Sequence, residues 1–201
     1  MSDTIRSFIA IELSAPAQQA LTALQGRLKT ISPPHAVRWT AIQNIHLTLH
    51  FLGDVTADRL EPIQAAMRAA AETVPPFALR LGGLGCFPNT SRPRVIWVGL
   101  TEANSSLSSL HAALGQKLAE AIDFAPETRP FSPHLTLGRV KSGIPKRHLP
   151  TLSQALQQEQ RRVGKLADLP VTEICLFQSE LRPTGAVYTR LFSSPLTANR
   201  E

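Results

Sequence analysis

One tetrapeptide occurs twice in this 201-residue chain, once in each half. The sequence His-Leu-Thr-Leu occupies positions 46–49, within NIHLTLHFLG, and positions 134–137, within FSPHLTLGRV. Side chains alternate between the two faces of a β-strand. A strand at each copy turns its histidine and threonine to one face and its two leucines to the other. The repeat therefore predicts two similar strands that cover a core with leucine and present polar groups on the opposite side.

The rest of the chain alternates between strand-like and helix-like segments. Leucines recur at helical spacing in three long segments, and a shorter helix is expected later in the chain. The predicted helices lie at 14–30, 56–73, 103–122 and 149–164, and the predicted strands or extended segments at 7–13, 37–39, 45–53, 77–87, 94–100 and 129–140. A closing hairpin is expected from 171–181 and 186–194, around Arg182-Pro183-Thr184-Gly185. This order predicts an α+β or α/β chain of two lobes.

The composition is that of a folded protein with an excess of positive charge. Hydrophobic residues make up 43% and charged residues 18%, which is enough apolar material for a core. The formal net charge of +6 favours an anionic partner such as RNA or a nucleotide. Cys86 and Cys175 are too far apart for a Cys-x-x-Cys metal site. The N-terminal segment lacks signal-peptide features and no run reaches transmembrane length, so we expect a cytoplasmic protein with no membrane partner. No pattern indicates an additional apolar interface, so we expect a monomer.

Two such strands near a twofold axis would bring two imidazoles and two hydroxyls into one cleft. Histidine titrates near neutral pH, so one imidazole can take a proton while the other gives one. Cleavage of a cyclic phosphodiester needs both steps, because the attacking water loses a proton and the leaving oxygen gains one. Threonine hydroxyls can hold the non-bridging oxygens, and a nearby arginine can stabilise their charge. The candidate site residues are His46, Thr48, His134, Thr136 and Arg139, with no cofactor or metal required.

Two residues near the repeats can be placed in more than one way. His46 and His50 are four apart, which on a helix is a zinc-binding spacing, but no glutamate lies between them and the segment favours a strand. On a regular strand His50 shares the face of His46 and is expected at the cleft edge or in packing. The face of Arg139 depends on the local twist or on a bulge at Gly138. A single His-x-Thr triplet is common in structural strands, so the prediction rests on the two copies.

These motifs resemble the 2H phosphoesterase superfamily and, within it, the bacterial and archaeal RNA 2′,3′-cyclic phosphodiesterase family, also called 2′-5′ RNA ligase. The resemblance spans most of the chain. Besides the two repeats it includes RSFIAIELS, GLGCFPNTSRPRVIWVGL and VTEICLFQSELRPTGAVYTRL. It implies a single bilobal domain over 1–201, with an α+β fold of two pseudo-symmetric lobes, antiparallel sheets that face a central cleft, and helices on the outside.

The resemblance also implies an activity. Members hydrolyse a terminal 2′,3′-cyclic phosphate of RNA to a 2′-phosphate, and some join tRNA halves through a 2′-5′ linkage by the reverse reaction. In the family the first-motif histidine is the proton donor and the second the proton acceptor, which correspond here to His46 and His134. The implied substrate-binding positions are Thr48, Thr136, Arg139 and the aromatic Phe8.

Two other interpretations stay open from the sequence. A non-catalytic module could bind an RNA end or a nucleotide in the same pocket, although binding alone would not need two titratable imidazoles. A phosphodiesterase of the same superfamily could instead act on a small cyclic nucleotide. The net charge of +6 favours RNA over such a small substrate.

Overall fold

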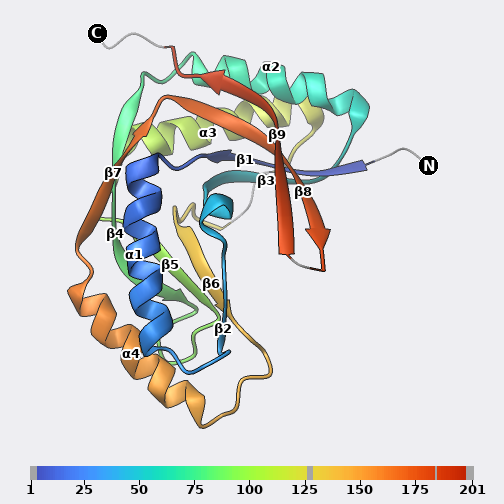
Figure 1. Cartoon of the computed structure of the whole chain (residues 1–201). Helices are drawn as coiled ribbons and strands as arrows, with labels where there is room; N and C mark the ends of the chain where they lie inside the picture. The colour runs from blue at the N-terminus through green and yellow to red at the C-terminus, as the bar shows by residue number, and fades with distance from the viewer. Residues whose placement is uncertain (1–3, 126–128, 184, 198–201) are drawn as a thin grey trace.

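The strands of the computed structural model form one curled antiparallel sheet (Figure 1). The structure describes residues 4–125, 129–183 and 185–197. The strands are β1 (Thr4–Ile11), β2 (Val37–Trp39), β3 (Leu47–Thr56), β4 (Phe77–Phe87), β5 (Val95–Leu100), β6 (Leu135–Val140), β7 (Lys165–Val171), β8 (Glu173–Arg182) and β9 (Gly185–Pro195). Their order in the sheet is β7-β4-β5-β6-β3-β1-β8-β9, and β2 also pairs with β6.

The sheet divides into two lobes at its centre. We call β3, β1, β8 and β9 the first lobe, and β2, β6, β5, β4 and β7 the second lobe. Within the described residues, one backbone pair joins them, between Leu47 of β3 and Leu135 of β6. These two leucines belong to the two copies of the repeat. The predicted two-lobed α+β architecture is therefore confirmed, and the repeat lies where the lobes meet.

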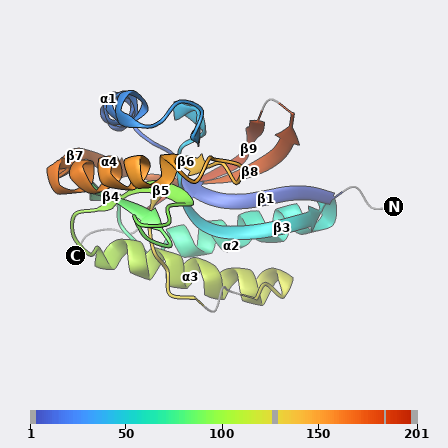
Figure 2. The same ribbon diagram turned by 90° about the horizontal axis from the view of Figure 1, so that it is seen from below.

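The helices lie outside the curled sheet and are exchanged between the lobes (Figures 1 and 2). They are α1 (Ala15–Ile31), α2 (Leu60–Ala71), α3 (Ser105–Ile122) and α4 (His148–Arg162), with short 3-10 helices η1 (Ile42–Asn44) and η2 (Ala57–Arg59). Helix α1 follows β1 of the first lobe but packs on β7 of the second lobe, beside α4. Helix α3 follows β5 of the second lobe but packs with α2 beside the first lobe. The chain thus crosses between lobes, which ties them together.

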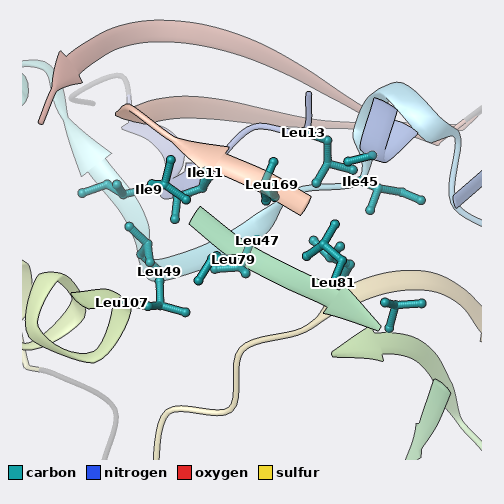
Figure 3. Packing of buried hydrophobic residues seen from close by; sticks show 14 of the residues in the cluster. Ile9, Ile11, Leu13, Ile45, Leu47, Leu49, Leu79, Leu81, Leu107 and Leu169 are labelled. Atoms are coloured by element: carbon teal, nitrogen blue, oxygen red, sulfur yellow. The ribbon is translucent and has the colours of Figure 1, made fainter. Parts of the chain in front are cut away.

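The leucine faces of both repeats lie in the core, as predicted. Leu47 and Leu137 are fully buried, and Leu49 and Leu135 nearly so. Figure 3 shows Leu47 and Leu49 packed among side chains of β1, β4 and β7, so a single apolar cluster draws on both lobes. Most predicted helical leucines are buried too, including Leu21, Leu24 and Leu28 of α1, whereas Leu60 at the start of α2 is half-buried.

Two segments near the end of the chain differ in how well the sequence predicts them. The closing hairpin of β8 and β9 is confirmed from its pairing, which begins at Arg182 and Gly185; Thr184, expected in its turn, lies outside the described residues. Strand β7 was not predicted, because Pro170 and a weak alternation mask it. Proline is tolerated there because β7 is an edge strand, which among the described strands pairs with β4 alone. Among the described helices, none is long and apolar enough to cross a membrane.

Candidate active site

The pairing of Leu47 with Leu135 sets the two repeats against each other. Because β3 and β6 are antiparallel, the residue after one leucine lies beside the residue before the other. Thr48 therefore lies beside His134, and His46 lies beside Thr136. All four side chains are partly exposed and point away from the core, on what we call the site face of the sheet. The structure brings together the four residues that the repeat predicted.

Both histidines are held by the same backbone contact. The Nδ1 atom of His46 lies 3.0 Å from the carbonyl oxygen of Asn44, and that of His134 lies 2.8 Å from the carbonyl oxygen of Ser132. A carbonyl oxygen only accepts hydrogen bonds, so Nδ1 carries the proton in each ring. The Nε2 atom is then the nitrogen that can accept or, in the charged ring, donate a proton. The two imidazoles are thus fixed in equivalent tautomers.

A β-bulge follows the threonine in both repeats. In β3, Leu49 has no partner between the pairs Thr48–Ala10 and His50–Ile9. In β6, Leu137 has no partner between the pairs Thr136–Trp97 and Gly138–Ile96. The extra residue in each strand reverses the alternation of faces beyond it.

The bulges settle the two placements that the sequence left open. Arg139 pairs with Val95, which pairs with Phe87, and the ring of Phe87 lies edge-on 5.0 Å from the ring of His134. Directly opposed residues share a face of a sheet. Arg139 therefore lies on the site face, as proposed for a bulge near Gly138.

His50, in contrast, does not share the face of His46, and the expectation from regular alternation was wrong. It is buried on the core side, stacked on the ring of His111 at 4.2 Å. Its Nε2 donates to the carbonyl oxygen of His111 at 3.0 Å. The expectation that it serves in packing is confirmed. His46 and His50 point to opposite faces, so they cannot share one metal ion.

Aromatic rings enclose His46. The ring of Phe8 stacks on the imidazole with centroids 4.5 Å apart, and Tyr188 lies edge-on at 5.2 Å. Phe8 is itself 3% exposed, in a small apolar cluster with Phe177 that is separate from the main core. Burial lowers the pKa of His46 to about 4, although the hydrogen bond to Asn44 acts in the opposite direction. In the free protein at pH 7 this imidazole is neutral.

His134 has a different set of neighbours. Besides the edge contact with Phe87, its ring lies 6.4 Å from that of Trp97. Trp97 covers Gly85 and Gly99, and a side chain at Gly85 would collide with the indole. These glycines leave room for the indole to lie against the sheet. No ring stacks face to face on His134 among the described residues.

Positive charge borders the enclosed histidine. Burial raises the pKa of Tyr188, whereas the charges of Arg139 and Arg6 lower it. Both guanidinium groups therefore act on the tyrosine that lies edge-on to His46. Arg139 comes from the second lobe and Tyr188 from the first, so the site is built across the junction.

One cluster of possible metal ligands occurs among the described residues, and it does not suit a metal ion. Glu12, Glu173 and Cys175 place their ligand atoms within 4.8 Å of one another. The guanidinium of Arg190 already lies 3.0 Å from Glu12 and 3.6 Å from Glu173. A cation would have to displace this arginine, and burial raises the pKa of the Cys175 thiol to about 12. The candidate active site is therefore the group of polar side chains on the two repeats.

Several contacts of the site could not be read from the sequence. The carbonyl groups of Asn44 and Ser132 leave no signature in residue type, because every residue has one. Tyr188 and Phe87 are far from the repeats in the chain, and only the sheet pairing brings them there. The shared spacing of the bulges, one residue past each threonine, becomes visible only with the partner strands in place.

Two histidines with equivalent tautomers, two hydroxyls and a cation are the groups that a two-histidine phosphoesterase would require. The family model described as LigT like Phosphoesterase matches the chain twice, over residues 11–97 and 98–188, with one repeat in each match. The chain belongs to this LigT-like family of the 2H phosphoesterase superfamily.

Relatives and solved structures agree with this membership. An RNA 2′,3′-cyclic phosphodiesterase of Methanothermobacter thermautotrophicus is 34% identical over 185 residues, which cover 92% of this chain and 95% of that protein. One of Thermus thermophilus is 33% identical, with 93% and 88% covered. A crystal structure from Thermus thermophilus has a TM-score of 0.78 at 28% identity, covering 97% of this chain and all of that one. E. coli LigT complexed with 3′-AMP has a TM-score of 0.72 at 27% identity, covering 97% and 99%.

Proposed function

We propose that this protein is an RNA 2′,3′-cyclic phosphodiesterase that hydrolyses a terminal 2′,3′-cyclic phosphate to a 2′-phosphate. The observation that carries the proposal is the pair of imidazoles on one face, each with Nδ1 bound to a carbonyl and Nε2 left for proton transfer. Relatives of that name cover nearly the whole chain. The reverse reaction, which would join tRNA halves through a 2′-5′ linkage, uses the same groups and belongs to the proposal.

In the proposed reaction His134 takes a proton from water, and the water oxygen bonds to phosphorus. The bond from phosphorus to the 3′ oxygen breaks, and His46 in its charged form gives that oxygen a proton from Nε2. Thr48 and Thr136 donate hydrogen bonds to non-bridging oxygens and keep phosphorus in line between the rings. Arg139 stabilises the charge that grows on those oxygens. No step passes through a metal.

The low pKa of His46 has to be reconciled with the role of proton donor. A ring with a pKa of about 4 is neutral in the free protein at pH 7. A bound phosphodiester adds a negative charge next to the imidazole and therefore raises its pKa. The pH dependence of kcat/KM reports the pKa of His46 in the free enzyme, and that of kcat reports its pKa in the substrate complex. The fall in activity on deprotonation of His46 is therefore expected at higher pH in kcat than in kcat/KM.

Phe8 and Phe51 are proposed to act in different ways. Phe8 was expected to bind substrate, but its ring is buried against His46, so we assign it the role of holding that imidazole. Phe51 pairs with Phe8 across β1 and β3 and therefore lies on the same face, and it is 61% exposed. Its open ring is the better candidate for stacking on a nucleobase.

The decisive experiment is a product assay on an RNA oligonucleotide that ends in a 2′,3′-cyclic phosphate. The expected product carries a 2′-phosphate, separable from the 3′-phosphate isomer. EDTA should leave the rate unchanged, because both proton transfers use imidazoles. Binding of the oligonucleotide without turnover would replace the proposal with a non-catalytic RNA-end module.

We also propose that the two lobes act as one domain in a cytoplasmic monomer. Support comes from the apolar cluster shared by both lobes, and from Cys86 and Cys175, which are buried and not joined in a disulfide. Light scattering of the purified protein tests the monomer, and fractionation of cells tests the compartment.

A further inference from the structure

A row of four directly opposed residues crosses the second lobe. Phe87 of β4 pairs with Val95 of β5, Val95 pairs with Arg139 of β6, and Arg139 pairs with Arg38 of β2. Opposed residues share a face, and Phe87 contacts the ring of His134. Arg38 therefore lies on the site face, one strand beyond Arg139.

The position of Gly138 supports the same placement. A Cβ atom at Gly138 would meet side-chain atoms of Val37 at 2.8 Å and of Trp39 at 3.0 Å. Val37 is buried in the main core. Gly138, Val37 and Trp39 therefore lie on the core face of the sheet. Side chains alternate along each strand, so Arg38 on β2 and Arg139 on β6 lie on the opposite face, which is the site face.

The two arginines form a like-charge pair without a carboxylate. Like charges directly opposite each other in a sheet are unfavourable. Both side chains are exposed, and within residues 4–125, 129–183 and 185–197 neither forms an ion pair, whereas Arg80 and Arg182 pair with Glu102 and Glu180. An anion between the two guanidinium groups would turn the repulsion into two charge-assisted contacts.

We propose that Arg38, next to Arg139, forms a second phosphate subsite for the phosphate on the 5′ side of the terminal nucleotide. Arg38 lies beside Arg139 on the edge of β6 that also pairs with β3, a few residues along β6 from the histidine–threonine set, so the two arginines place positive charge to one side of the reacting phosphate. In an RNA end the next phosphate of the chain has the charge to occupy this place, and a cyclic mononucleotide with a 5′ hydroxyl does not. The substrate class is therefore an RNA end, and this inference rests on the proposed function.

The test compares two substrates that differ by one phosphate. Adenosine 2′,3′-cyclic phosphate is assayed with and without a 5′-phosphate, for the wild type, Arg38→Ala and Arg38→Lys. The wild type should prefer the 5′-phosphorylated substrate by roughly tenfold or more in kcat/KM. Arg38→Ala should bring that ratio close to one, mainly through KM, and Arg38→Lys should restore part of it because it keeps the charge.

Arg161→Ala is the matched control, since Arg161 is an exposed residue of α4 without an ion pair in the described structure. It removes the same charge, and its ratio should equal that of the wild type. The inference is overturned by a wild-type ratio near one, by an unchanged ratio in Arg38→Ala, or by an equal fall in Arg161→Ala. Absence of turnover on both nucleotides and on the RNA oligonucleotide would instead refute the proposed function.

Discussion

The two repeats have the same backbone construction and different surroundings. In each, Nδ1 bonds to the carbonyl two residues earlier and a bulge follows the threonine. Yet His46 is stacked on Phe8 and its pKa is lowered to about 4, whereas His134 meets only the edge of Phe87 and a more distant Trp97. The repeated backbone construction therefore gives the two imidazoles equivalent positions, and the neighbouring side chains give them different environments. The two imidazoles are therefore not equivalent in the free protein, and His46 can act as the proposed donor once a bound phosphodiester has raised its pKa.

The two repeats also differ in the residue that lies on the site face after each bulge. It is Phe51 in the first lobe and Arg139 in the second, three positions past the threonine in both. One lobe thus offers an exposed aromatic ring and the other a cation. Under the proposed function, the aromatic and the anionic part of a nucleotide would each meet a matching group, which favours a single orientation between the lobes.

The largest effect is expected from removing either imidazole. His46→Ala and His134→Ala should each lower kcat by about 10²- to 10⁴-fold, because each removes one proton transfer. The double variant should be little worse than the single variants, because the two groups act as a pair. The measurement is kcat on the cyclic phosphate oligonucleotide, with circular dichroism to check the fold.

His148→Ala, at the start of α4, is the control for loss of a histidine. It should keep wild-type activity. A near-normal kcat in His46→Ala or His134→Ala would contradict the proposal that both repeats take part in the reaction, because one of the two histidines would then be dispensable.

The enclosure of His46 should also affect stability at acid pH. Its pKa falls from 6.5 to about 4 on folding, so between these values the unfolded chain binds a proton that the folded chain does not. The free energy of unfolding is therefore expected to drop as the pH falls from about 6.5 to about 4, by at most about 3 kcal/mol. Denaturant unfolding at several pH values measures this.

His46→Gln should lose less stability than the wild type over the same pH range. Part of the wild-type loss should persist in the variant, since burial also lowers the pKa of His111 to about 4. Identical pH dependence in both proteins would show that the enclosure of His46 has no energetic effect.

The two threonines should give smaller and more equal effects. Thr48→Val and Thr136→Val keep the shape and remove the hydroxyl, so each should lower kcat/KM by roughly 10- to 100-fold through one lost hydrogen bond to a charged oxygen. Thr22→Val, on the exposed side of α1, is the matched control and should change little. A much larger loss at one threonine would mean that the phosphate lies closer to that lobe.

The smallest effect concerns the bulges. Gly138 and His50 occupy the same place after their bulges, but β2 packs against Gly138 and the ring of His111 packs against His50. Gly138→Ala should therefore cost about 1–3 kcal/mol of stability, because its Cβ would press on Val37. Gly143→Ala, which meets no atom within 4 Å, is the control. Equal unfolding midpoints for the two variants would mean that β2 moves aside freely.

Local pattern predicted most of the buried leucines, the four helices and the four polar residues of the repeats, because alternation and helical spacing are properties of neighbouring residues. It could not predict the bulges, since these depend on which strand pairs with which. His50 shows the consequence, because its strand was predicted correctly but the face of the sheet on which it lies was not. Arg38 was missed for the same reason, because only its pairing with Arg139 brings it to the site.

The single backbone pair between Leu47 and Leu135 also marks the point where the two lobes are nearest in the sheet. If one lobe rotates against the other about the Leu47–Leu135 pair, each residue moves in proportion to its distance from that pair. The histidines and threonines flank the pair directly, so their mutual spacing would change little, while the β8–β9 hairpin and α4 would travel far. The shared core and the exchanged helices restrain such a rotation, and the four residues of the repeats lie where it would disturb them least.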